Sequence, residues 1–198
     1  MNPQEWGKRA QRIRVPASMV LGIVFLAFMR PSLGSIGVGA AIALAGAGLR
    51  VWAAGHLEKG KALAQSGPYR FTRNPLYLGS LLMASGVLVA GKGYWLLPPF
   101  ALFYGVVYYS VMKAEEIELG QRYGDEYRRY ASRVAIFLPK WSAGPFGPGH
   151  SSEAAGEFSW SRVLRNGEHR TMAGLLVIGG FLILRAKWFV QPWGWPHL

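Results

Sequence analysis

The segment SGPYRFTRNPLYLG at residues 66–79 carries the side chains with the clearest chemical potential in an otherwise apolar chain. Its Gly-Pro start predicts a turn. Asn74 is a good N-cap and Pro75 suits the first position of a helix, so we expect a helix to begin at Pro75 with its free N–H groups beside Arg73. A cation, the phenol of Tyr77 and helix N–H groups at one place would bind an anion. The plainer alternative is a capped helix start with a cation that reaches the membrane surface.

Two acids, Glu115 and Glu116, follow a pair of apolar runs joined by a three-residue turn. At about 1.5 Å per residue each run is about 24–30 Å long, close to the hydrocarbon thickness of a bilayer. A hairpin of that length returns the acids to the membrane face that carries Arg73, so we expect them to share a site. The alternative is an acidic surface cluster that pairs only with Lys113 or Arg122.

The wider pattern Gly-Pro-Tyr-Arg-x-x-Arg-Asn-Pro-x-Tyr-x-Gly at residues 67–79, followed by the two acids, resembles the signature of the isoprenylcysteine carboxyl methyltransferase and phospholipid methyltransferase families. The resemblance covers about residues 50–140 and includes RYGxxYxxY at 122–130 and FLP at 137–139. It implies an integral-membrane enzyme that uses S-adenosylmethionine. These families usually have His at the place of Asn74, and Asn cannot titrate near neutral pH, so a proton-transfer role of that His does not carry over.

The resemblance assigns the motif to the cofactor region. A cation and helix N–H groups would hold the donor carboxylate, and an acid would pair with its ammonium group or ribose hydroxyls. Methyl transfer from a sulfonium requires alignment and exclusion of water but no metal, so no metal ligands are expected. The expected catalytic residues are Arg50, Arg73 and Glu116. The expected cofactor-binding residues are Tyr69, Asn74, Pro75, Tyr77, Leu78, Gly79, Glu115 and Glu116.

The acceptor determines which side chains matter beyond the cofactor. A carboxylate acceptor is already ionised and needs an orienting cation such as Arg50 or Arg73, whereas an amine needs a base such as Glu115 or Glu116. Both sets are present, so the sequence leaves the choice open. The resemblance implies a lipophilic acceptor, an isoprenylcysteine-type carboxylate or a lipid head group, that enters from the bilayer. Arg50 could alternatively be a cation that snorkels to the interface.

Composition predicts a membrane protein. The chain has 198 residues, of which 51% are hydrophobic and 16% charged, with a net charge of +12 and no Cys. Its Lys and Arg lie between apolar blocks, which favours membrane topology over nucleic-acid binding. We predict an all-α, polytopic membrane helix bundle that forms a single domain over residues 1–198, with about five transmembrane helices and a cytosolic or interfacial helix between the last two of them, in the segment 113–140. The expected spans are about 15–29, 36–54, 75–90, 94–112 and 171–190, and a mobile loop is expected at about 141–161.

The second expected span is rich in Gly and Ala, which allows close helix packing in lipid. The first could instead be a signal peptide, but no small-x-small cleavage site follows it. Seventeen Lys and Arg fall on one side of the five-span arrangement and four on the other. The N-terminus and the candidate site are therefore expected to face the cytosol, and the C-terminus the outside, of a bacterial or archaeal cell membrane.

Two other classes of function stay open. Membrane reductases of the steroid-reductase type are similar in hairpin architecture and carry a related Arg-x-Pro-x-Tyr motif, but they use NADPH. A membrane scaffold without enzymatic activity would leave Arg73, Glu115 and Glu116 without a common pocket. The expected partners are membrane lipids and a lipophilic methyl acceptor, with neither nucleic acid nor metal.

Overall fold

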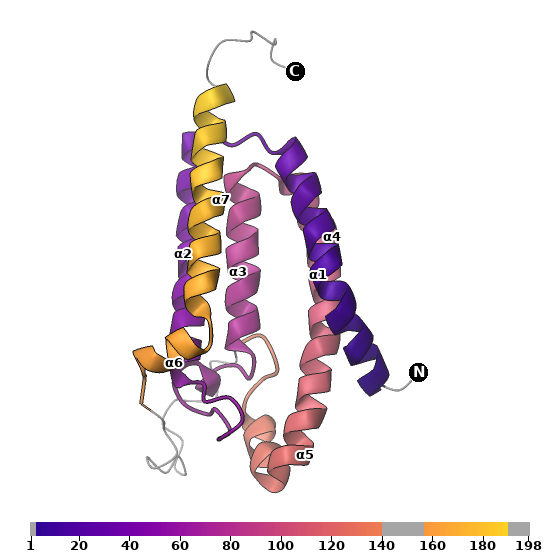
Figure 1. Cartoon of the computed structure of the whole chain (residues 1–198). Coiled ribbons are helices and arrows are strands. Elements are labelled where there is room, and N and C mark those ends of the chain that lie inside the picture. The colour runs from indigo at the N-terminus through magenta and orange to yellow at the C-terminus, as the bar shows by residue number, and fades with distance from the viewer. Residues whose placement is uncertain (1–2, 140–156, 190–198) are drawn as a thin grey trace.

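The computed structural model describes residues 3–139 and 157–189, which form a bundle of helices (Figure 1). The chain is 80% helical, and the described residues contain no strand, so the all-α prediction is confirmed. The elements are α1 (Pro3–Phe28), α2 (Leu33–His56), η1 (Gly67–Arg70), α3 (Pro75–Ala90), η2 (Tyr94–Leu96), α4 (Leu97–Phe103), η3 (Tyr104–Tyr108), α5 (Tyr109–Arg133), α6 (Trp160–Arg165) and α7 (Glu168–Phe189).

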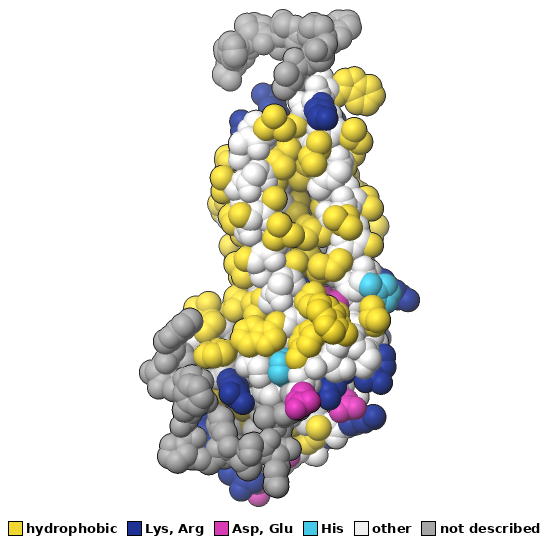
Figure 2. All heavy atoms as spheres, turned by 90° about the vertical axis from the view of Figure 1, so that its left-hand side faces the viewer, with side chains coloured by type: hydrophobic (Ala, Val, Ile, Leu, Met, Phe, Trp, Pro, Cys, Tyr) yellow, Lys and Arg dark blue, Asp and Glu magenta, His cyan; other side chains and the backbone are white. Residues whose placement is uncertain are grey.

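Within the described residues, three helical stretches are long and apolar enough to cross a membrane, namely Leu33–His56, Tyr94–Arg133 and Glu168–Trp188. Pro16–Phe28 and Pro75–Ala90 are shorter apolar helices. The five expected apolar spans therefore all appear as helices, two of them shorter than a full span. Figure 2 shows apolar side chains over the upper part of one face, with most charged side chains gathered below them. This distribution is the one a bilayer selects.

Helices α2 and α3 pack more extensively than any other pair of described helices. The packing uses glycines seven residues apart, Gly39 and Gly46 on α2 and Gly79 and Gly86 on α3. A Cβ added at Gly46 would lie 2.6 Å from the carbonyl oxygen of Gly79, so only glycine lets the two backbones approach this closely. The close packing expected from the small residues of the second span is confirmed.

The fourth expected span runs on further than predicted. Its prolines, Pro98 and Pro99, lie in the first turn of α4, where a missing N–H is tolerated. A π-helical turn, η3, then joins α4 to α5, and α5 runs on into the polar segment that was expected as a separate interfacial helix. At Gly124 the backbone leaves the helical region (φ 52°, ψ −121°), which breaks α5 and redirects its last nine residues.

Helix α7 confirms the last expected span and α6 was not predicted. Within the expected mobile loop at 141–161, residues 141–156 lie outside the described part of the chain. In Figure 1, α2, α3 and α7 lie side by side, while α1 lies against η3 and α5. The polar connector between α2 and α3, the end of α5 and the start of α7 all lie at the same end of the bundle, and they enclose the candidate site.

Candidate active site

The start of α3 is built as predicted, but Asn74 acts differently. Pro75 occupies the first turn of α3 and Asn74 the N-cap position, yet the Asn74 side chain makes no capping hydrogen bond. Its Nδ2 instead donates to the carbonyl oxygen of Ile136, at 2.8 Å, in the segment that follows α5. The backbone N–H of Arg73 also donates to that segment, to the carbonyl oxygen of Ala135 at 2.9 Å. The motif is thereby joined to the chain after α5, and α3 begins at the pocket without a side-chain cap.

Arg73 and Glu116 meet as the hairpin argument predicted. Arg73 Nη1 donates to Glu116 Oε1 at 2.7 Å and to the phenol oxygen of Tyr127 at 3.0 Å. Lys113 Nζ donates to the other oxygen of Glu116, also at 2.7 Å, so the local pairing offered as the alternative is present as well. Burial alone would lower the pKa of the Arg73 guanidinium, but the hydrogen bonds to Glu116 and Tyr127 and the charge of Glu116 hold this pKa above its ordinary value.

The Nε atom of Arg73 is buried and has no hydrogen-bond partner among the described residues. A buried, unsatisfied donor on a cation is unfavourable unless a ligand completes it. Arg73 lines the pocket, so this unsatisfied donor belongs to a side chain that borders the pocket.

Glu115 is held by Tyr77. The Tyr77 hydroxyl donates to Glu115 Oε1 at 2.6 Å, and the hydroxyl of Tyr104 donates to the backbone carbonyl of Tyr77. The rings of Tyr104 and Tyr108 stack with their centroids 4.0 Å apart, and Tyr108 meets the Tyr77 ring edge-on at 5.5 Å. The π-helical turn therefore supplies an aromatic wall that fixes Tyr77 and, through it, a carboxylate at the pocket.

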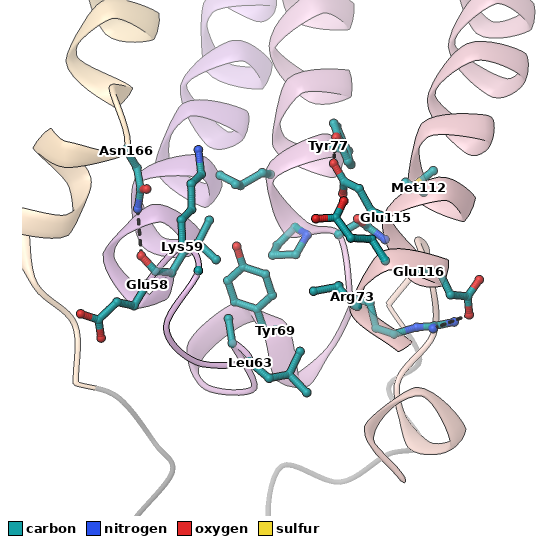
Figure 3. A pocket seen from close by; sticks show the side chains of 18 of the residues that line it. Glu58, Lys59, Leu63, Tyr69, Arg73, Tyr77, Met112, Glu115, Glu116 and Asn166 are labelled. Carbon is teal, nitrogen blue, oxygen red and sulfur yellow. Dashed lines mark hydrogen bonds and ion pairs between the residues drawn. The ribbon is translucent and has the colours of Figure 1, made fainter. Parts of the chain in front are cut away.

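Tyr69 projects from η1 into the middle of a cavity of about 930 Å³ (Figure 3). Lys59 lies on one side of it, and Tyr77 and Arg73 lie on the other. Burial raises the pKa of the Tyr69 hydroxyl far above its ordinary value, so it stays a neutral donor. The carbonyl oxygen of Tyr69 accepts from the hydroxyl of Tyr130, which follows the break in α5.

Arg50 points into the protein and not to the interface. Its Nε and Nη2 donate to the two carboxylate oxygens of Glu168 at 2.9 and 2.7 Å, and its Nη1 donates to the Leu76 carbonyl at 3.3 Å. Snorkelling is therefore the wrong interpretation of this cation. Both Arg50 and Glu168 line the pocket, which places the start of α7 in its wall.

The structure separates the remaining predicted site residues. Those that line the pocket are Tyr69, Arg73, Asn74, Pro75, Tyr77, Glu115, Glu116 and Arg50. Leu78 and Gly79 are not among the described residues of its lining. Gly79 lies in the α2–α3 interface, where an added Cβ would come within 2.6 Å of Arg50 Cγ. Its absent side chain gives room to Arg50, so Gly79 shapes the pocket through this neighbour.

Sequence reasoning missed three contributors. Glu168 was not singled out, although an acid at the start of an apolar helix is a signal worth testing against a buried cation. Tyr127 and Tyr130 appear in the sequence only within the RYGxxYxxY segment and without an assigned role, yet Tyr127 accepts a hydrogen bond from Arg73 and Tyr130 donates one to the carbonyl oxygen of Tyr69. Gly124 has a positive φ, which turns both tyrosines toward the motif. The glycine itself is the only feature of the sequence that indicates this turn.

Comparison with known proteins supports the family resemblance. Residues 33–126 match the family model described as phospholipid methyltransferase. The chain is 32% identical over 113 residues to the cobalt-zinc-cadmium resistance protein CzcN of Cupriavidus metallidurans, which covers 56% of this chain and 50% of that protein. It is 34% identical over 71 residues to methanethiol S-methyltransferase 1 of Bradyrhizobium diazoefficiens, which covers 36% of this chain and 24% of that protein.

The chain thus spans about half the length of the first relative and about a quarter of the second. No solved structure matches it. The matched segment contains α2, the motif, α3, the hairpin, Glu115 and Glu116. Over residues 33–126 the chain is therefore similar to the phospholipid methyltransferase family.

Proposed function

We propose that the protein is an S-adenosylmethionine-dependent methyltransferase whose acceptor is lipophilic and whose site faces the cytosol. The observation that carries the proposal is the pocket that brings Arg73, with its buried Nε, together with Glu115 and Glu116 at the uncapped start of α3. Its volume of about 930 Å³ is near the upper end of the roughly 300–1,000 Å³ found for small-molecule sites, which suits a cofactor together with the reacting end of an acceptor.

The residues have distinct roles in this proposal. Arg73 would hold the donor carboxylate, and Glu116 keeps Arg73 charged and in place. Glu115, oriented by Tyr77, would pair with the donor ammonium group or with ribose hydroxyls. S-adenosylmethionine, when bound, supplies a methyl group on a positively charged sulfur.

The lipophilic acceptor is supported by a second, apolar cavity of about 440 Å³ that lies between α1, α3, α4 and α7. Ser18, Ser80 and Tyr108 line both cavities, so the apolar cavity adjoins the polar pocket. A hydrocarbon chain in the apolar cavity would present its polar end at that junction. Arg50 is our candidate for orienting this end, and an anionic acceptor would have to take the place of Glu168 at its guanidinium.

The test uses the purified full-length chain in lipid nanodiscs, with methyl-labelled S-adenosylmethionine and a lipid extract of a bacterial membrane. We expect saturable binding of the donor and label in the lipid fraction, where mass spectrometry identifies the acceptor. A parallel assay contains added thiols. If only these thiols became labelled, the methyltransferase activity would be supported and the lipophilic acceptor rejected. Tight binding of NADPH with none of the methyl donor would overturn the proposal in favour of a reductase.

A further inference from the structure

A second charged pocket lies at the end of the bundle away from the candidate active site. Three cations line it, and each comes from a different part of the chain: Arg30 follows α1, Lys92 lies in the turn after α3, and Arg185 lies near the end of α7. The pocket has a volume of about 510 Å³, and its described lining contains no acidic side chain. We call this set of three cations the basic pocket.

The backbone under the basic pocket is well fixed. A buried apolar cluster that includes Phe25, Met29 and Leu182 packs α1, the α3–η2 turn and α7 together. The N–H of Arg30 donates to the carbonyl oxygen of Gly91 at 3.0 Å, which joins the loop after α1 to this turn. The three cations are thus brought together by the packing of the bundle, not only by the reach of long side chains.

Lys92 has an unusual backbone conformation. Its φ is +54°, and it is the only non-glycine residue with a positive φ in the described part of the chain. Glycine is favoured in this conformation, and glycines stand on both sides of Lys92. The backbone at position 92 thus favours glycine, yet the position carries a lysine that lines the basic pocket.

A multivalent anion in a concave site gains favourable Coulomb energy from each of the cations that line it. A phosphate offers several acceptor oxygens, which Arg and Lys engage with strong charge-assisted hydrogen bonds. On the cytoplasmic side of membranes, basic pockets between transmembrane helices bind phospholipid head groups, and the same phosphate chemistry applies to a basic pocket at the opposite leaflet.

Aromatic rings beside the cations indicate that the basic pocket lies at the membrane surface. Phe28 and Trp95 line the basic pocket, contact each other edge-on with centroids 5.8 Å apart, and are 65% and 53% exposed. Trp at this level is typical of the interface between head groups and hydrocarbon. A phosphate at the three cations would therefore have apolar rings beside it on which the attached glycerol and acyl chains could pack.

We propose that the basic pocket binds a phosphate group, carried by an anionic phospholipid of the leaflet opposite the candidate active site. The proposal does not rest on the proposed function, because the two pockets share no described residue. Free inorganic phosphate offers the same chemistry, and the experiment distinguishes these two sources.

The experiment compares the full-length protein in three kinds of nanodisc. They contain phosphatidylcholine alone, phosphatidylcholine with about 20% phosphatidylglycerol, and phosphatidylcholine with inorganic phosphate added to the buffer. The readouts are the melting temperature and the lipids retained in native mass spectrometry. We expect phosphatidylglycerol to raise the melting temperature and to be retained. Lys92→Gln and Arg185→Gln should each reduce the retained phosphatidylglycerol several-fold.

Lys187→Gln is the matched control, because Lys187 lies two residues beyond Arg185 on α7 but does not line the basic pocket. It should retain phosphatidylglycerol like the wild type. A rise in melting temperature with inorganic phosphate alone would keep the phosphate site and reject the lipid as its source. Equal loss in all three variants, or no response to either phosphate source, would overturn the proposal.

Discussion

Arg50 and Glu168 are 118 positions apart in the chain and form a two-pronged ion pair that joins α2 to α7. The side chain of Glu168 is only 4% exposed and that of Arg50 18%. A pair this deeply buried is held in place by its geometry, and removal of one partner leaves the other charge without compensation. The pair therefore couples the position of α7 to the shape of the pocket.

Glu168→Gln should destabilise the protein, toward the lower end of the about 3–5 kcal/mol found when one partner of a buried pair is removed, because the amide retains some hydrogen bonding. The free energy of unfolding in mixed micelles measures this effect. The double variant Arg50→Gln/Glu168→Gln should lose less than the sum of the two single variants. Strict additivity would show that the two side chains do not interact.

Glu116→Gln should weaken binding of S-adenosylmethionine about ten- to a hundred-fold, since a lost charged hydrogen bond costs roughly 1.5–3 kcal/mol. The neutral amide no longer fixes Arg73 at the pocket. Titration calorimetry measures the affinity. Asp125→Asn is the matched control, because it removes one negative charge from the same helix at an exposed position. Wild-type affinity in the Glu116 variant would place the Arg73–Glu116 pair outside the donor site.

The Asn74→Asp variant tests whether Asn74 caps α3 or joins the start of α3 to the segment after α5. Asp caps a helix as well as Asn does, so a capping role would leave stability unchanged. Asp has no N–H to donate to Ile136 and would place a carboxylate against a carbonyl oxygen, so we expect a loss of about 1–3 kcal/mol. Asn74→His keeps a donor and should remain closer to the wild type. Melting temperatures of the three proteins give the answer, and an Asp variant as stable as the wild type would restore the capping role.

Gly46→Ala and Gly48→Ala form a matched pair on α2. A Cβ at Gly46 would meet the backbone of α3 within 2.7 Å, whereas one at Gly48 has nothing within 4 Å. We expect Gly46→Ala to lose about 1–3 kcal/mol through overpacking and Gly48→Ala to be neutral or to gain up to about 1 kcal/mol of helix propensity. Unfolding in mixed micelles measures both variants. Equal effects would mean that α2 and α3 do not pack through this face.

Topology is the fifth prediction. A reporter inserted after Gly149 should behave as cytosolic, and one fused at Leu198 as external, because the positive-inside rule places the cation-rich end of the bundle in the cytosol. Paired enzymatic and fluorescent reporters measure the side directly. Both reporters on one side would mean that α7 does not cross the membrane.

The parts of the site that the sequence predicted depend on local or repetitive signals. Pro75 marks the start of α3, and the matched lengths of the two hairpin runs bring Glu116 back to Arg73. The Gly and Ala content of the second span predicted its close packing. Each of these features requires only neighbours in sequence or the fixed rise of a helix.

The parts that escaped prediction depend on contacts between distant segments. Whether Asn74 caps its own helix or bonds to Ile136 depends on where the chain after α5 returns, and this follows from the break at Gly124. The partner of Arg50 lies beyond a segment whose path has no periodic signal. In each case the local sequence preference favours one hydrogen-bond partner, but the tertiary contacts of the folded chain select a different one.

The match to the family ends at residue 126, so the carboxylate that holds Arg50 lies outside it. Chains that share the matched segment can therefore be grouped together while they differ in what completes the pocket wall. Transfer of a substrate assignment among such relatives is sound only where the alignment extends to the residue that stands at Glu168.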